Sequence, residues 1–310
     1  MDNLLSMTLV TGLLNTMVVL ATPFLFAALG ETFTQNSGVV NLGVDGIMLL
    51  SAFFAFYVVL VSGSLMLGIL AAVAVGLVMG LIMSVASITL KAEQGVSGIG
   101  LQMFGLGMSS LLFKVLVGTV KTVDGFPALP IPLLSSIPFV GPIFFQHSVL
   151  VYVAFLMVPV TWWILERSTW GLVIKAVGQN PAAADSRGIG VDLVRYVCVC
   201  FGAVMAGLAG ASLSISSLNL FQDNLTAGQG FIAVALVYFG GWSPVGVMWG
   251  ALLFSIANSF QLWMQVLGVP VPASLANMLP YLLTVVALTL SGRRHRKPAA
   301  LNKPFIRGEA

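Results

Sequence analysis

Long apolar stretches follow one another along almost the whole chain. They lie at about residues 8–29, 39–61, 65–90, 95–119, 148–166, 193–217, 226–241, 244–267 and 273–291. Most are close to the ~20 residues that an α-helix needs to cross the hydrocarbon core of a bilayer. Charged residues make up 7% of the chain, against about 25% in an average soluble domain. The sequence therefore predicts an all-α, multi-pass membrane helical bundle.

The length and the charge pattern predict a single transmembrane domain. The 310 residues suffice for about eight to ten spanning helices with short loops. We expect this domain to cover residues 1–292, followed by a basic tail at 293–310. Basic residues next to a membrane span favour the cytoplasmic side. Counting spans back from the tail places segment 167–192 in the cytoplasm. It places the N-terminus and the loop 121–146 outside, and the five prolines of this loop predict that it is partly extended and not helical.

A polar island, KAVGQNPAAADSRGIG, interrupts the apolar pattern at Lys175–Gly190. Asn180 is placed to cap the N-terminus of a helix, Pro181 suits the first helical position, and Gly188 suits the end. The predicted helix of one or two turns is too short to be stable alone in water. It would therefore need a groove in a partner protein. The alternative is an ordinary cytoplasmic loop.

Several spans carry residues that are unusual inside a membrane. NLGVDG at Asn41–Gly46 brings a carboxylate into an apolar run, five glycines interrupt residues 95–107, and residues 226–241 are barely long enough to cross. Broken helices occur in membranes where they are buried in protein or line a cavity. We therefore expect breaks that border a pathway. The alternatives are close packing of small residues, which we favour for Gly76 and Gly80, and a purely structural carboxylate at Asp45.

The candidate pathway residues are mostly amides. They are Asn41, Asp45, Gln102 and Gln229. An ion-coupled carrier buries several acidic or cationic groups at depth, whereas amides suit an uncharged solute that forms hydrogen bonds. The sequence therefore favours a small polar solute.

The chain carries no recognisable catalytic, metal-binding or ATP-binding motif. Its two histidines, His147 and His295, have no cysteine or carboxylate at ligand spacing. A glycine-rich phosphate loop followed by Lys-Ser/Thr is absent from the sequence. Basic residues are not interleaved with aromatic ones as in a nucleic-acid site. We therefore predict a transport protein without enzymatic activity, cofactor, metal or nucleic-acid partner, surrounded by membrane lipid.

Three motifs together resemble a known family. GETFTQNSGVVNLGVDGIMLL, the Lys175–Gly190 island and GQGFIAVALVYFGGWSPVG are similar to permease subunits of bacterial ABC importers for branched-chain amino acids, ribose-like sugars and nucleosides. The likeness is greatest to the nucleoside and simple-sugar branch. It implies a type II-like importer permease in the bacterial inner membrane. It also implies three protein partners: a separate cytoplasmic ATPase, a second and different permease subunit, and an extracytoplasmic substrate-binding lipoprotein.

The resemblance also implies a role for the polar island. It would be the coupling helix, which docks into the ATPase, and the matching positions are Lys175, Gly178, Asn180, Pro181, Ala183, Ala184, Asp185 and Gly188. Lys175 stands where relatives commonly have arginine. This keeps the charge and loses the bidentate fork of a guanidinium.

Two other classes of protein remain open from the residues alone. A stand-alone secondary carrier would need no ATPase, but the chain has few buried ionisable groups. A membrane-embedded structural protein would carry no solute, and the amide-containing, interrupted spans argue against it.

Overall fold

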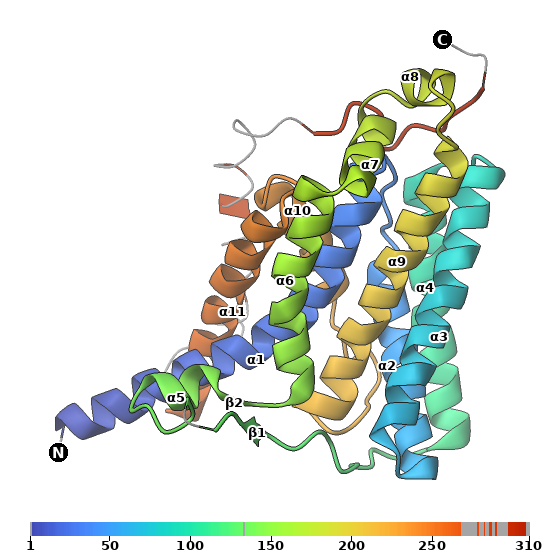
Figure 1. Cartoon of the computed structure of the whole chain (residues 1–310). Coiled ribbons are helices and arrows are strands. Elements are labelled where there is room, and N and C mark those ends of the chain that lie inside the picture. Colours follow the sequence, from blue (N-terminus) through green and yellow to red (C-terminus); the bar gives the residue numbers. More distant parts are fainter. Residues whose placement is uncertain are drawn as a thin grey trace.

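The computed structural model describes residues 2–132, 134–267 and 297–307, together with a few isolated positions between 278 and 289. Nearly all regular structure in this part is helical, which confirms the all-α membrane bundle (Figure 1). The first half contains α1 (Asp2–Asn36), α2 (Val44–Ser62), α3 (Leu65–Ser84), the π-helical turn η1 (Val85–Thr89) and α4 (Gln94–Leu116). The connection to the second half holds β1 (Leu129–Pro130), α5 (Val140–Phe144) and β2 (Gln146–His147). The second half contains α6 (Val149–Arg167), α7 (Thr169–Gln179), α8 (Pro181–Ser186), α9 (Val191–Ser212), the π-helical turn η2 (Leu213–Ser217), α10 (Gln229–Phe239) and α11 (Pro244–Val266).

Seven helical segments in the described residues are long and apolar enough to cross a membrane. They are Leu9–Asn36, Val44–Ser62, Leu65–Thr89, Gln94–Leu116, Val149–Arg167, Val191–Ser217 and Pro244–Val266, and each matches a predicted span. The predicted span at 226–241 is corrected: α10 has 11 residues, which rise only about 16 Å. Residues 218–228 before it are not helical. The predicted span at 273–291 lies outside the described residues, apart from isolated positions.

Local sequence sets several helix ends. The Ser64 hydroxyl accepts a hydrogen bond from the Leu67 N–H, and the Glu93 carboxylate accepts from the N–H groups of Gly95 and Val96. Each is an N-cap, which satisfies donors that have no partner inside the helix. Gly63 ends α2 with φ of 69°, a left-handed conformation that glycine adopts readily.

The glycines of α4 do not break it, contrary to the prediction. The helix runs without interruption from Gln94 to Leu116. A Cβ added to Gly98 would lie 2.7 Å from the Leu42 nitrogen, and one added to Gly105 would lie 2.3 Å from the Gly46 oxygen. These glycines therefore allow close backbone approach to the start of α2, the packing alternative.

The same reason explains Gly76 and Gly80 on α3, for which close packing was predicted. A Cβ on Gly76 would lie 2.6 Å from the Ala203 oxygen, and one on Gly80 would lie 2.6 Å from the Ala203 Cβ. The prediction is confirmed, since both glycines contact α9.

The loop at 121–146 is extended only in part. β1 and β2 pair in antiparallel fashion, with Leu129 opposite His147. The expectation that the loop is not helical is wrong for α5, which contains Pro142 near its start, where proline is tolerated. This loop and the N-terminal end of α1 lie at one end of the bundle, and α8 lies at the opposite end (Figure 1).

Helices α1, α2 and α9 form the interior of the bundle. Their membrane segments are the most buried ones of the described chain. Helices α3 and α4 lie on one side of them, and α6 and α11 lie on the other (Figure 1). This arrangement brings the start of α2, which carries Asp45, into the centre of the protein.

Candidate coupling helix and polar junction

The polar island forms the short helix that its residues predict. The Ala183 N–H donates a hydrogen bond to the Asn180 side-chain oxygen at 3.0 Å, and Pro181 occupies the first helical turn. The helix ends before Gly188, whose φ is +81°. The cap, the proline and the left-handed glycine thus act as expected.

The coupling candidates divide into accessible and packed residues. Ala184 is the one buried residue of α8, while Ala183 and Gly188 are exposed. Gly178 is buried in α7, and a Cβ there would lie 2.0 Å from the Asn36 oxygen. Lys175 Nζ lies 2.7 Å from Glu166 Oε1, an intramolecular ion pair with both side chains partly exposed. Most residues of α8 are therefore accessible, whereas α7 packs through Gly178 against Asn36 at the end of α1.

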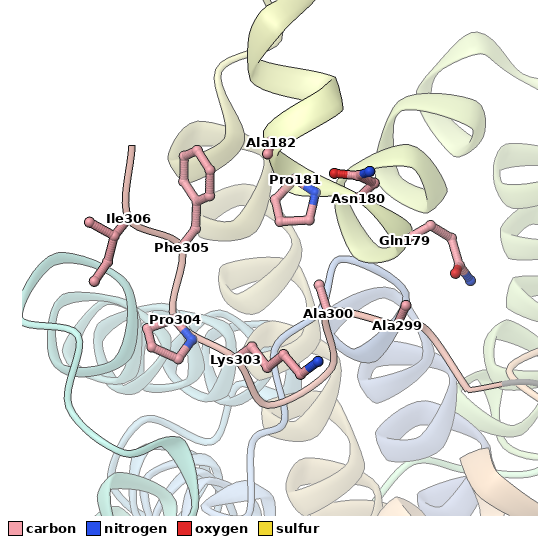
Figure 2. A pocket seen from close by; sticks show the side chains of 10 residues that line it. All are labelled: Gln179, Asn180, Pro181, Ala182, Ala299, Ala300, Lys303, Pro304, Phe305 and Ile306. Atoms are coloured by element: carbon pink, nitrogen blue, oxygen red, sulfur yellow. The ribbon is translucent and has the colours of Figure 1, made fainter. Parts of the chain in front are cut away.

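A pocket lies beside the N-terminal end of α8 (Figure 2). Its volume is about 570 Å³, and its walls come from residues 179–182 and from the tail at 299–306. Sequence reasoning predicted the short helix α8 that borders this pocket, but not the pocket itself. It did not predict that the tail would lie against it.

A second group of polar residues is buried where α1 ends and α2 begins. Glu31 Oε1 accepts hydrogen bonds from the Asn41 N–H at 3.1 Å and from the Gln35 amide at 3.2 Å. The Gln35 oxygen accepts from the Trp242 indole N–H at 2.9 Å. We call this group, together with Asp45, the polar junction. It joins α1, the 37–43 connection and the turn between α10 and α11.

Asp45 connects two helices that begin inside the bundle. It lies in the first turn of α2, and its Oδ1 accepts a hydrogen bond from the Gly230 N–H at 2.9 Å. A Cβ on Gly230 would lie 2.4 Å from the Asp45 Cα. A carboxylate is favourable at a helix N-terminus because unpaired N–H groups and the helix dipole point there. Asp45 thus caps the start of α10, which is distant in sequence. The cap acts between two segments and not within the Asn41–Gly46 interruption.

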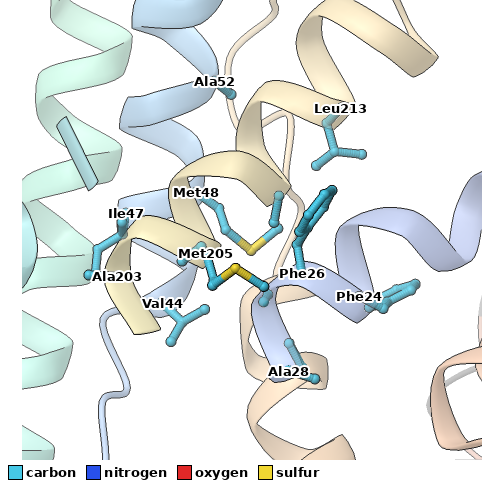
Figure 3. Packing of buried hydrophobic residues seen from close by; sticks show 14 of the residues in the cluster. Phe24, Phe26, Ala28, Val44, Ile47, Met48, Ala52, Ala203, Met205 and Leu213 are labelled. Carbon is cyan, nitrogen blue, oxygen red and sulfur yellow. The ribbon is translucent and has the colours of Figure 1, made fainter. Parts of the chain in front are cut away.

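Buried apolar side chains of α1, α2 and α9 pack together beside the start of α2 (Figure 3). Val44, Ile47 and Met48 of α2 pack in the same buried cluster as Met205 of α9 and Phe26 of α1. In this surrounding, an unpaired polar group would be costly. The hydrogen bonds of Glu31 and Asp45 offset part of that cost.

The four predicted pathway residues lie on segments that meet around the start of α2. A Cβ on Gly46 would lie 2.5 Å from the Gln102 Cα, and Gln229 precedes the Gly230 that binds Asp45. Gln102 and Gln229 are half-buried, and Gln229 Oε1 has no hydrogen-bond partner in the described protein. Asn41 is turned inward, with its side-chain oxygen accepting from the Gly43 N–H at 2.9 Å.

Sequence reasoning missed Arg195, which is 1% exposed. Its Nε donates to the Ser37 oxygen and its Nη1 donates to the Lys303 oxygen, both at 3.2 Å. A lone arginine close to the start of an apolar span was the available signal, because buried charges in membranes have a specific partner.

Comparison with known proteins agrees with the resemblance. Residues 13–288 match the family described as the branched-chain amino acid transport system permease component. A relative named "Putative glucose ABC transporter permease protein", from Haloferax volcanii, is 39% identical over 84% of this chain and 80% of its own length.

Two further relatives match over almost the full length of both proteins. A guanosine ABC transporter permease protein of Bacillus subtilis is 36% identical over 94% of this chain and 95% of its own length. A nucleoside ABC transporter permease protein of Lactococcus lactis is 32% identical over 94% and 96%. With its bundle of apolar helices, the chain is a multi-pass membrane protein that belongs to the branched-chain amino acid transport system permease family.

Proposed function

We propose that this chain is a permease subunit of an ATP-driven importer and that its solute is a nucleoside. Two of the relatives compared above are named for guanosine or nucleosides, and they match this chain nearly end to end. A simple sugar is the second candidate, because the relative from Haloferax volcanii is named for glucose. The relatives of this chain are named as ABC transporter permease proteins. This supports a separate ATPase as the source of energy and the bacterial inner membrane as the location.

The observation that carries the coupling part of this proposal is the build of α8. It is a six-residue helix with its own cap, and Ala184 is its one buried residue. A helix of this length needs a surrounding groove to be stable, and within the described residues Ala182, Ala183 and Ser186 of α8 remain exposed. The cytoplasmic ATPase is the proposed source of that groove. A second permease subunit and an extracytoplasmic lipoprotein complete the assembly that we propose.

The contacts of α7 suggest how movement of α8 reaches the membrane interior. α7 and α8 meet at Asn180, and Gly178 of α7 touches the backbone of Asn36. The connection from Asn36 leads through Asn41, which is held by Glu31, to Asp45. Asp45 in turn holds the start of α10. A displacement of α8 by the ATPase would therefore shift two helix starts at the centre of the bundle.

Half-exposed polar groups support a solute path along α4 and the segment before α10. Gln102 and Ser110 lie eight residues apart on α4, close to two helical turns, and so occupy one side of the helix. The Ser110 hydroxyl donates to Asp223 Oδ1 at 2.7 Å. Asp223 lies in the non-helical segment 218–228, which leads to Gln229. We propose that the solute passes along this strip, and that the second permease subunit supplies the opposite wall.

Two measurements test the proposed function. The tagged chain is extracted gently from its native membrane, and copurifying proteins are identified by mass spectrometry. Uptake of radiolabelled guanosine and glucose is then compared in cells with and without the chain. Copurification of an ATPase and chain-dependent guanosine uptake support the proposal. Uptake by the chain alone in liposomes without ATP, abolished by ionophores, would instead identify a secondary carrier.

A further inference from the structure

The tail residues 297–307 are fastened to the same end of the bundle as α8. The Ala300 N–H donates to the Gly178 oxygen at 2.9 Å, and the Asn302 N–H donates to the Gly38 oxygen at 3.1 Å. Ala300 is 6% exposed. These bonds attach the tail both to α7 and to the connection that follows α1.

Two arginines add further attachments. The buried Arg195 donates to the Lys303 oxygen and to the Ser37 oxygen, both at 3.2 Å. Arg307 Nε lies 2.9 Å from Asp185 Oδ2 on α8. The side chain of Phe305 packs against the small apolar cluster that includes Ala184. The tail is thus held at several points between Ala300 and Arg307, and these contacts fix its position relative to α8.

The pocket between α8 and the tail has a mixed chemistry (Figure 2). Asn180, Pro181 and Ala182 line one wall, and Lys303, Pro304 and Phe305 line the other. The described lining residues include Lys303 as their single charged group. Lys303 is exposed, and no ion pair of Lys303 occurs in the described part of the chain. Asp185, the nearest acid on α8, is already paired with Arg307.

We propose that the tail is the second wall of the ATPase-docking surface, so that this surface consists of α8 and residues 299–307 together. The occupant would be a segment of the ATPase that places a carboxylate against Lys303 and an apolar side chain between Pro181 and Phe305. Two observations support this partner: the pocket continues onto the outward side of α8, and the Lys303 cation on its wall has no ion pair among the described residues. The inference rests on the proposed docking of α8.

Charge reversal at Lys303 tests the proposal in the intact transporter. The Lys303→Glu variant and a matched control, Lys297→Glu, are compared with the unchanged chain. Lys297 lies on the same segment and is exposed, but it does not line the pocket. The readout is the amount of ATPase that copurifies per permease at moderate salt. We expect Lys303→Glu to retain about tenfold less ATPase, because like charges repel at an interface, and Lys297→Glu to retain the normal amount.

A second measurement identifies what contacts Lys303. A zero-length carbodiimide reagent joins lysine amines to carboxylates that are in direct contact, and mass spectrometry locates the products. We expect a link from Lys303 to the ATPase. A link from Lys303 to a second copy of this chain would overturn the proposal. It would also be overturned if Lys303→Glu copurified with less membrane lipid but with the normal amount of ATPase.

A third variant separates this inference from the proposed function. Ala183→Arg alters an exposed position of α8. If Ala183→Arg loses the ATPase and Lys303→Glu does not, α8 docks alone and the tail proposal is wrong. If neither variant loses the ATPase, the proposed docking of α8 is wrong as well.

Discussion

The helix α8 and the polar junction are built in opposite ways. The cap of α8 joins Asn180 to Ala183, three residues away, and most of the helix is accessible. The junction joins Asp45 to Gly230 and Gln35 to Trp242, across 185 and 207 residues, and all these bonds are buried. One region is a local structure on the surface, and the other is a meeting of distant segments in the core.

This difference separates two kinds of effect that a substitution can have. Changes on an exposed surface usually alter the free energy of unfolding by less than about 0.5 kcal/mol. Changes that crowd a packed core or remove a buried partner cost about 1–3 kcal/mol. Variants of α8 should therefore lose transport while keeping stability, and variants of the junction should lose both.

Removal of α8 should have the largest effect on transport. We expect deletion of Ala182–Asp185 to reduce uptake to background, while the protein still inserts and elutes as a single species from size-exclusion chromatography. The control is Ser186→Ala, a small change at an exposed position of the same helix that does not line the pocket. Normal uptake by the deletion variant would show that α8 does not couple the chain to an ATPase.

Crowding of the junction should have the largest effect on stability. A side chain at Gly230 would meet backbone atoms of Asp45 at 2.4 Å, so we expect Gly230→Val to lower the free energy of unfolding by about 1–3 kcal/mol or more. Thermal unfolding in detergent measures the loss. Gly107→Val is the matched control, because a Cβ on Gly107 meets no atom within 4 Å. Equal melting temperatures for the two variants would contradict the close approach of α2 and α10.

Removal of the Asp45 charge should have an intermediate effect. In Asp45→Asn the side chain keeps an oxygen that can accept from the Gly230 N–H, but the charge at the two helix starts is lost. We expect a stability loss of up to about 2 kcal/mol, with assembly retained and slower uptake. Asp45→Ala serves as comparison, since it also removes the acceptor. If uptake and stability both match the unchanged chain, the carboxylate has no role in the junction.

A pH change should have the smallest effect and should act on neither region. His147, in β2, lies at the end of the bundle opposite α8 (Figure 1). Burial lowers the pKa of His147, while its hydrogen bond to the Ile143 oxygen raises the pKa by a lesser amount. The folded protein therefore favours neutral His147. Its contribution to stability is complete above about pH 6.5, the ordinary value, and is lost as the pH falls through the lower folded pKa.

The test of this prediction compares melting temperatures at pH 7.5 and 5.5. The unchanged chain should lose more stability on acidification than His147→Gln, which cannot titrate. The two proteins should behave alike at pH 7.5 apart from a constant offset. Identical acid sensitivity would show that His147 does not contribute.

The sequence predicted the seven apolar helices and the build of α8 correctly, because both depend on short-range signals. A run of apolar residues of the right length is sufficient for a spanning helix. Asn180, Pro181 and Gly188 act on backbone groups within a few residues. The family resemblance, too, came from contiguous motifs.

The errors arose where one local pattern suits two tertiary outcomes. Glycines at 98 and 105 are compatible with a broken helix or with close packing, and only the position of Leu42 and Gly46 decides between them. The length of residues 226–241 suggested a crossing helix, whereas residues 218–228 are not helical and α10 has only 11 residues.

The sequence by itself thus determined that this protein is a multi-pass helical bundle with a short capped helix between two spans. Tertiary structure alone decided that Asp45 caps α10, that Arg195 holds the tail, and that the tail faces α8. The physical reason is that caps and apolar length act within a few residues. A buried carboxylate or guanidinium is satisfied by whichever distant backbone group the packing brings to it.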